Sequence, residues 1–167
     1  IAVNDVNETP TAVSLAGSSV DENDAGAIVG ALGATDLDAG DSHTYTVDDV
    51  RFEVVAGQLK LKAGESLDHE AEASVDVTVK ATDAGGLATS QTFTVAVNDV
   101  NEAPTAIALD NGSVDENASG AVVGMLSASD PDAGDTHTFT VDDVRFEVVA
   151  GQLKLKAGES LDHEAAA

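Results

Sequence analysis

The sequence predicts an all-β protein made of tandem β-sandwich repeats, the second of which is incomplete. The first observation is composition: 43% of the 167 residues are hydrophobic, only 3% are aromatic, and tryptophan is absent. The second is a period-two alternation of apolar and polar residues, rich in valine and threonine, which is typical of short strands. The third is an internal repeat with an offset of 94 residues. This regular alternation favours packed domains over disorder.

The repeat defines the domain organisation. Residues 46–71 and 140–165 are identical, and shorter segments match at the same offset, namely 4–12 with 98–106 and 19–23 with 113–117. A period of this length fits a sandwich domain of roughly 100 residues better than a solenoid. We therefore assign residues 1–4 to the tail of a preceding repeat, 5–98 to repeat one and 99–167 to an incomplete repeat two.

Within repeat one, alternating runs bounded by Gly, Asp and Asn predict strands at 11–16, 27–34, 43–47, 51–55, 58–62, 74–81 and 89–97. Ala56-Gly57 lies between two such runs and predicts a tight hairpin turn. Two sets of side chains are expected to share a face, Val75, Val77, Val79 and Ala81 in one strand, and Phe93, Val95 and Val97 in another. Seven strands in this length is the count of an immunoglobulin-like Greek key sandwich.

Repeat two has counterparts of the first five predicted strands but not of the last two, because nothing in it matches 74–83 or 89–97. It should therefore expose an apolar inner face and open sheet edges, which invite pairing with another chain. We expect repeat two to be either partly disordered or completed by a neighbouring molecule.

The charge balance restricts the partners. There are 31 acidic and 7 basic residues, for a net charge of −24. Nucleic acid and anionic membranes are poor partners for such a chain, since both require clustered Lys and Arg, whereas divalent cations are natural partners. The absence of cysteine excludes disulfides, thiolate zinc sites and a cysteine nucleophile. No membrane span or signal peptide is visible, so we expect any export signal or anchor to lie outside this segment.

The acidic residues gather between the predicted strands. They form DEN at 21–23, DxD at 36–38, LDHE at 67–70 and DVNE at 99–102. If the strands run up and down, one end of repeat one and the start of repeat two bring seven carboxylates together, those of Glu22, Asp68, Glu70, Asp99, Glu102, Asp130 and Asp132. Two carboxylates about 4 Å apart repel by roughly 4 kcal/mol at an effective dielectric near 20. Calcium, with its flexible shell of oxygen ligands, would neutralise them better than magnesium.

The order of these motifs resembles the cadherin repeat, especially its bacterial tandem forms. The resemblance rests on DEN, DxD, F-x-V-x-x-G-x-L, LDHE, V-x-A-T-D and DVNEAP, and it covers nearly the whole chain. It implies a calcium-binding role. Glu22 takes the place of the glutamate in the PEN motif, and Asp68 and Glu70 those of the acids in LDRE, with His69 where arginine usually stands. Glu22 and Glu70 should each contact two calcium ions, and Asp41 is taken as a reference residue expected to contribute less.

The same resemblance implies the remaining ligands. Asp99, Asn101 and Glu102 correspond to the linker DxNDNxP, although DVNEAP is one residue shorter, and Asp130 and Asp132 to the DxD of the following repeat. Asp83 should join Asn7, Asp36 and Asp38 at the opposite end of repeat one. Because repeat two ends before a counterpart of Asp83, the third calcium site at the 99–132 junction should lack one ligand.

Enzymatic interpretations are weaker. A glycosidase carboxylate pair would lie beside an aromatic sugar platform, and aromatic residues are scarce in this sequence. A hydrolase triad that uses Ser66 and His69 is disfavoured because the sequence has no nucleophile elbow. We therefore expect a non-enzymatic, extracellular, cell-surface protein whose adjacent repeats form a calcium-stiffened rod. Its adhesive partner would be homophilic, another cell-surface protein or a glycan, although near-identical repeats favour a spacer. The alternative is a carbohydrate-binding module of a secreted polysaccharide-degrading protein.

Overall fold

The computed structural model describes residues 1–166 and divides the chain into two compact units. Unit 1 comprises residues 1–100, and unit 2 begins at residue 101. Among the described residues, the helical structure is a single 3-10 turn, η1 (Glu164–Ala166). No helix in this part of the chain has the length and apolar character needed to cross a membrane.

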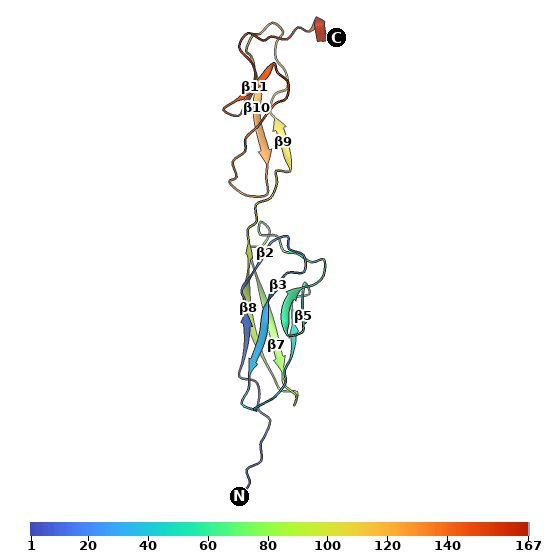
Figure 1. Cartoon of the computed structure of the whole chain (residues 1–167), viewed down its shortest axis with the longest axis vertical. Helices are drawn as coiled ribbons and strands as arrows, with labels where there is room; N and C mark the ends of the chain where they lie inside the picture. The colour runs from blue at the N-terminus through green and yellow to red at the C-terminus, as the bar shows by residue number, and fades with distance from the viewer. Residues whose placement is uncertain (167) are drawn as a thin grey trace. The chain divides into compact units, whose positions relative to one another are not determined.

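Unit 1 is a sandwich of two four-stranded sheets (Figure 1). One sheet has the order β1-β3-β6-β5 and the other β2-β8-β7-β4. All strand pairs are antiparallel except β2 with β8. The strands are β1 (Ala12–Ala16), β2 (Ser19–Asp21), β3 (Ile28–Thr35), β4 (Thr44–Val47), β5 (Phe52–Val55), β6 (Gln58–Leu61), β7 (Ser74–Thr82) and β8 (Ala88–Asn98). The predicted all-β sandwich is thus confirmed.

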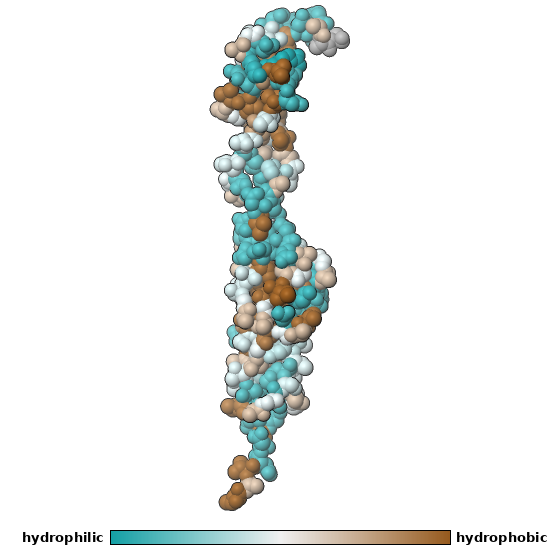
Figure 2. Space-filling view, viewed as in Figure 1, coloured by the Kyte–Doolittle hydropathy of each residue, from teal (hydrophilic) through white to brown (hydrophobic). Residues whose placement is uncertain are grey.

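A single apolar core lies between the two sheets. β7 shows how the alternating sequence builds it: Val75, Val77, Val79 and Ala81 are buried in one face, as predicted, while Asp76 and Lys80 are exposed on the other. Val95 and Val97 of β8 join the same core, and Phe93 packs against it half-buried. Burial of such side chains stabilises a domain by about 1.5–3 kcal/mol each. Hydrophilic residues cover much of the surface seen in Figure 2, where apolar patches interrupt them on both units.

The prediction of seven strands is wrong for unit 1, which has eight. The first predicted strand, 11–16, pairs with β3 as β1; the chain then crosses at Gly17 to the other sheet, where β2 pairs with β8. A Cβ atom on Gly17 would collide with the backbone oxygen of Val29, so glycine permits the close approach of β1 and β3. The three residues of β2 are too few to show a period in sequence.

The predicted hairpin turn at Ala56-Gly57 is confirmed. β5 and β6 pair directly up to Val55 opposite Gln58, and the two turn residues have φ angles of 50° and 76°. Positive φ at both central residues is the mark of a type I′ turn, whose twist matches that of the flanking strands. Unit 2 repeats the turn at Ala150-Gly151, with φ angles of 51° and 77°.

Unit 2 contains one four-stranded sheet in its described part, with the order β11-β12-β10-β9. Its strands are β9 (Ala106–Leu109), β10 (Val122–Ser129), β11 (Phe146–Val149) and β12 (Gln152–Leu155). These are counterparts of β1, β3, β5 and β6 at the repeat offset. Of the five strands predicted for repeat two, the third, the counterpart of 43–47, is wrong, because 137–141 is not a strand. In unit 1 this strand, β4, pairs with β7, and unit 2 has no sequence corresponding to β7.

Candidate metal-binding clusters

The end of unit 1 at which β2 and β8 finish carries a cluster of ionisable side chains, here called the C-terminal cluster: Glu22, His69, Glu70 and Asp99. Its position follows from the strand pairing. β2 and β8 run parallel with Asp21 opposite Asn98, so Glu22 and Asp99, the residues that follow, emerge at the same end of the sandwich. The LDHE loop between β6 and β7 reaches this end too, as the hydrogen bond from the Asn23 amide to the Leu67 carbonyl shows.

Glu22 lies at the base of the cluster, with only 3% of its surface exposed. The amide of His69 donates to Oε2 and the amide of Val100 donates to Oε1, each at 2.8 Å. These two backbone hydrogen bonds, that of Val100 first, hold the pKa of Glu22 below its ordinary range. A buried carboxylate therefore stays ionised at the centre of the cluster.

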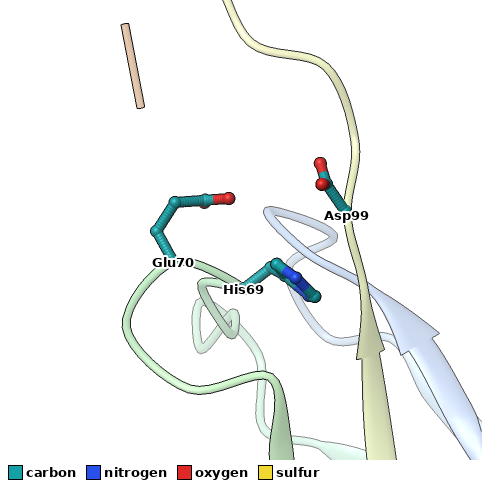
Figure 3. Close-up of side chains that lie close together, drawn as sticks. All are labelled: His69, Glu70 and Asp99. Atoms are coloured by element: carbon teal, nitrogen blue, oxygen red, sulfur yellow. The ribbon is translucent and has the colours of Figure 1, made fainter. Parts of the chain in front are cut away.

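Glu70 and Asp99 complete the cluster around Glu22. One carboxylate oxygen from each of the three residues lies within 4.8 Å of the others. Figure 3 shows the carboxylates of Glu70 and Asp99 directed toward the same space, with the His69 ring beneath them. His69 Nδ1 lies 2.6 Å from the carbonyl oxygen of Val97. That hydrogen bond is the largest cause that raises the pKa of His69. Burial opposes it, and the negative charges of Asp99 and Glu70 add smaller increases.

Asp68 has a different local role. Its Oδ1 accepts a hydrogen bond of 3.0 Å from the amide of Ala71, and its carbonyl accepts the amide of Glu72. The aspartate thus shapes the turn that leads from the LDHE loop into β7. Its side chain remains exposed beside the cluster.

The hydrogen bonds of Glu22 lead to a pH prediction for the calcium-depleted protein. Because the pKa of folded Glu22 lies below the unfolded value of about 4.3, its ionised form adds stability that is fully present above the unfolded pKa and is lost as the pH falls through the lower folded pKa. In the Glu22→Gln variant, the side chain at this position is an amide that does not titrate. The difference in unfolding free energy between wild type and variant should therefore shrink as the pH falls from about 5 to about 3.

Urea unfolding in the presence of chelator measures this difference. The fluorescence of Tyr45, the single tyrosine of the chain, reports on unit 1 because Tyr45 lies in β4. Asp24→Asn, in the same loop and exposed, is the control for the loss of one charge. A difference between wild type and Glu22→Gln that stays constant with pH would contradict the prediction.

The opposite end of unit 1 carries the N-terminal cluster: Asp5, Asn7, Glu8, Asp36, Asp38, Asp41 and Asp83. Asp83 is buried; its Oδ1 accepts the Leu87 amide at 2.8 Å and its Oδ2 accepts Asn7 Nδ2 at 2.9 Å. Asp38 Oδ2 accepts the Glu8 amide at 2.7 Å. The structure therefore joins the predicted residue Asn7 with Asp83, and brings Asp36 and Asp38 together.

His43 contacts the predicted ligand Asp36. Its Nε2 lies 3.0 Å from Asp36 Oδ2, while the amide of Asp38 donates to Asp36 Oδ1 at 3.1 Å. The hydrogen bond from His43, followed by that from Asp38, lowers the pKa of Asp36. Asp36 is thus an ionised group whose orientation is set by two neighbours.

Three acidic residues of the N-terminal cluster were missed in the sequence. Asp41 lies with Asp36 and Asp38, and Asp5 and Glu8 lie with Asp38, each group with ligand atoms within 4.8 Å of one another. Asp41 Oδ2 is buried without a hydrogen-bond partner among the described residues. Asp41 is therefore a poor choice as a reference residue outside the sites. The sequence signal that could have identified Asp41 is its position as the third aspartate of the run DLDAGD.

Unit 2 has its own N-terminal cluster, formed by Asn101, Glu102, Asp130 and Asp132. The Glu102 amide donates to Asp132 Oδ2 at 2.6 Å, and the Asp132 amide donates to Asp130 Oδ1 at 3.2 Å. His137 Nε2 lies 2.7 Å from Asp130 Oδ2, as His43 does beside Asp36. Asn101 Nδ2 donates to the Glu102 carbonyl at 2.9 Å. Asp130, Asp132 and His137 thus repeat the arrangement of Asp36, Asp38 and His43, whereas Asp83 has no counterpart in the sequence.

The donor atoms of these clusters fit a hard cation. They are closely spaced carboxylate oxygens, and they include Oδ2 of Asp41, which is buried and has no hydrogen-bond partner in the part of the chain that the structure describes. Calcium accepts six to eight oxygen ligands in irregular arrangements, whereas magnesium requires near-octahedral geometry and retains its waters. Asp36, Asp38 and Asp41 could hold an ion at one end of unit 1, and Glu22, Glu70 and Asp99 at the other.

Comparison with known proteins supports the fold assignment. No protein-family model matches the chain. Protocadherin gamma-C4 of Homo sapiens and that of Pan troglodytes are each 30% identical to it over 143 residues, covering 79% of this chain. The chain spans 15% of the length of these curated relatives. Both are primate proteins, so the narrower resemblance to bacterial tandem forms is not supported.

Solved structures match over nearly the whole chain. The EC1-4 segment of PcdhgB3 has a TM-score of 0.66 and 23% identity, and covers 98% of this chain and 44% of its own. Extracellular cadherin domains 1-5 of protocadherin gamma B2 have a TM-score of 0.60 and 24% identity, and cover 97% of this chain and 35% of their own. At sequence identities of 23% and 24%, the structural match is evidence for the fold alone. The chain therefore has the fold of tandem cadherin ectodomain repeats.

Proposed function

We propose that this chain is a calcium-binding segment of an extracellular cell-adhesion or surface protein, in which calcium stiffens successive repeats into a rod. The observation that carries the proposal is the C-terminal cluster of unit 1, where Glu22, Glu70 and Asp99 gather carboxylate oxygens around a common space. Such carboxylates repel one another strongly unless a cation lies between them.

In this proposal each calcium group takes ligands from the end of one repeat and the start of the next. The first repeat supplies Glu22, Asp68, Glu70 and Asp99, and the second supplies Asn101, Glu102, Asp130 and Asp132. The equivalent ligands toward a preceding repeat are Asn7, Asp36, Asp38 and Asp83, joined by Asp41.

The location and partners follow from the named relatives. Both are protocadherins, and the matched structures include extracellular cadherin domains. Extracellular location, a non-enzymatic role and a homophilic, cell-surface or glycan partner are therefore part of the proposal. Near-identical repeats support a spacer role. No observation favours the alternative function of a carbohydrate-binding module. Tyr45 and the four phenylalanines are buried or half-buried and offer no exposed platform for a sugar.

Calcium titration by calorimetry tests the proposal. The wild-type chain should bind calcium with dissociation constants of about 10⁻⁴ to 10⁻³ M, the range of extracellular modules. Glu22→Gln keeps the size of the side chain but removes its charge, and should weaken binding at unit 1's C-terminal cluster by at least about tenfold. Asp24→Asn, the matched loss of one exposed charge, should leave the isotherm close to wild type. Absence of binding, or equal effects of the two variants, would overturn the assignment.

A further inference from the structure

The loop that contains the DEN motif differs between the two units in a way that changes its chemistry. In unit 1 the sequence from residue 23 is Asn-Asp-Ala-Gly, and in unit 2 the sequence from residue 117 is Asn-Ala-Ser-Gly. Only the unit 2 loop has a hydroxyl-bearing residue two positions after its asparagine. Asn117-Ala118-Ser119 is therefore an Asn-x-Ser acceptor sequence for N-linked glycosylation, in which x is not proline.

The two loops have the same backbone conformation. Asn23 and Asn117 both have a φ angle of 60°. Their amides donate to equivalent carbonyls, that of Leu67 at 2.9 Å and that of Leu161 at 2.8 Å. Asparagine tolerates this left-handed conformation better than most residues, which explains its presence in both loops. Because the same turn forms with Ala25 in unit 1, the turn itself does not require the hydroxyl of the unit 2 loop.

Asn117 presents its side chain to solvent. Asn117 and Ser119 are both exposed, and neither side chain makes a hydrogen bond within the described part of the chain. Asn23 is exposed at the same place in unit 1, where both sheets of the sandwich are present. The exposure is thus a property of this loop and does not depend on the number of strands in unit 2. The amide nitrogen of Asn117 is accessible, and a bulky group on it has room in the solvent.

Two other Asn-x-Ser/Thr sequences, 7–9 and 111–113, provide an internal comparison. Asn111 Nδ2 donates to the carbonyls of Ser113 at 2.9 Å and Val123 at 2.6 Å. Asn7 Nδ2 donates to Asp83 Oδ2 at 2.9 Å and to a neighbouring carbonyl at 3.3 Å. A sugar on either nitrogen would replace one of its two hydrogens and break one of these hydrogen bonds. Among the three acceptor sequences, the one that begins at residue 117 is therefore the most compatible with a glycan.

We propose that Asn117 is an N-glycosylation site that carries an oligosaccharide on Nδ2. The inference rests on the extracellular location proposed above, because acceptor sequences of this kind are modified in secreted proteins. In the reaction Nδ2 attacks the anomeric carbon of an oligosaccharide linked to a lipid diphosphate. The new bond joins Nδ2 to that carbon, and the bond between that carbon and the diphosphate oxygen breaks. The lipid diphosphate leaves, and one Nδ2 proton passes to a base of the transferase.

Unit 1 shows that a substituent at this position can avoid the neighbouring acidic side chain. Glu22 is buried, and its carboxylate accepts the amides of His69 and Val100. The next residue, Asn23, is exposed. The two consecutive side chains thus lie in different surroundings, one within the C-terminal cluster and the other in solvent. An oligosaccharide on Asn117, the counterpart of Asn23, would extend from the loop into solvent.

The test produces the full chain behind a cleavable signal peptide in cultured animal cells. Peptide N-glycosidase in water enriched in oxygen-18 converts each glycosylated asparagine into a labelled aspartate, which identifies the occupied residue by mass. Subsequent proteolysis after glutamate separates Asn111 from Asn117, because Glu116 lies between them. Only molecules that have lost the signal peptide are scored, since these have crossed the membrane. Asn117 should be labelled in most of these molecules, and Asn111 in fewer.

Two substitutions of Ser119 provide the matched control. Ser119→Ala reproduces the alanine of the unit 1 loop, so the turn should form as before, and labelling of Asn117 should fall by at least about tenfold. Ser119→Thr keeps a hydroxyl at this position and should retain the label. Absence of label at Asn117 in the wild-type chain, or equal labelling in the two variants, would overturn the inference.

Calcium calorimetry on the unglycosylated chain distinguishes failure of this site from failure of the proposed function. A chain that binds calcium but carries no label at Asn117 would contradict the glycosylation site alone. A chain that is labelled at Asn117 but binds no calcium would contradict the calcium-binding function alone.

Discussion

Replacing Phe52 by alanine is expected to lower the free energy of unfolding of unit 1 by about 3–5 kcal/mol. Phe52 is only 2% exposed and lies at the start of β5, where it belongs to the core between the two sheets. Its removal leaves a cavity and forfeits the contacts of a complete ring, and a well-packed sandwich relaxes only partially into such a space. Urea unfolding followed by Tyr45 fluorescence should show the loss, because Tyr45 packs against the same core.

Phe146→Ala is the matched control, since it removes the same residue from an identical local sequence. Phe146 is half-buried, so its truncation gives up less packing and a smaller cavity. Because Tyr45 lies in unit 1, the tyrosine transition should shift by less than about 0.5 kcal/mol in this variant. Equal shifts of the tyrosine transition in the two variants would show that the units do not unfold as separate cooperative bodies.

Calcium is expected to raise the melting temperature of unit 1 by about 10–20 °C. An ion that binds only the folded state at about 100 times its dissociation constant stabilises it by about 2.7 kcal/mol. For a domain of this size each kcal/mol corresponds to about 4–8 °C. With a dissociation constant of about 10⁻⁴ M, 10 mM calcium reaches this regime. The measurement is a thermal melt followed by tyrosine fluorescence, in calcium and in excess chelator.

Two comparisons make the melt specific for the proposed site. Magnesium at the same concentration should give a smaller shift, because its octahedral preference suits these clusters poorly. Glu22→Gln should lose much of the calcium-dependent increase, whereas Asp24→Asn should retain it. A melting temperature indifferent to both calcium and chelator would contradict calcium binding in the range proposed here.

The sequence alone predicted the elements whose signals are local. The alternation of Val75, Val77 and Val79 predicted β7 and its buried face, because the period of a strand depends only on consecutive residues. Ala56-Gly57 predicted the hairpin turn for the same reason. Glu22, Glu70 and Asp99 were predicted to gather at one end of repeat one. Each lies beside the end of a predicted strand, and successive strands that run up and down place their loops at alternate ends of the sandwich. The acidic residues at strand ends thus carried most of the candidate site.

Other features depended on contacts between distant segments. β2 was missed because three residues have no readable period and owe their strand conformation to pairing with β8. Asp41 was missed as a member of the N-terminal cluster because its neighbours are set by the folding of the DLDAGD loop. The turn made by Asp68 likewise depends on its hydrogen bond to Ala71.

Repeat two shows the limit of local sequence most directly. Thr44–Val47 forms β4 in unit 1, whereas 138–141, which differs only by phenylalanine in place of Tyr45, is not a strand in unit 2. The alternating sequence determined which residues can lie in a strand and which face they would bury. Tertiary structure decided whether the strand forms, because its hydrogen bonds and its buried face are both completed by β7, a segment far away in the chain.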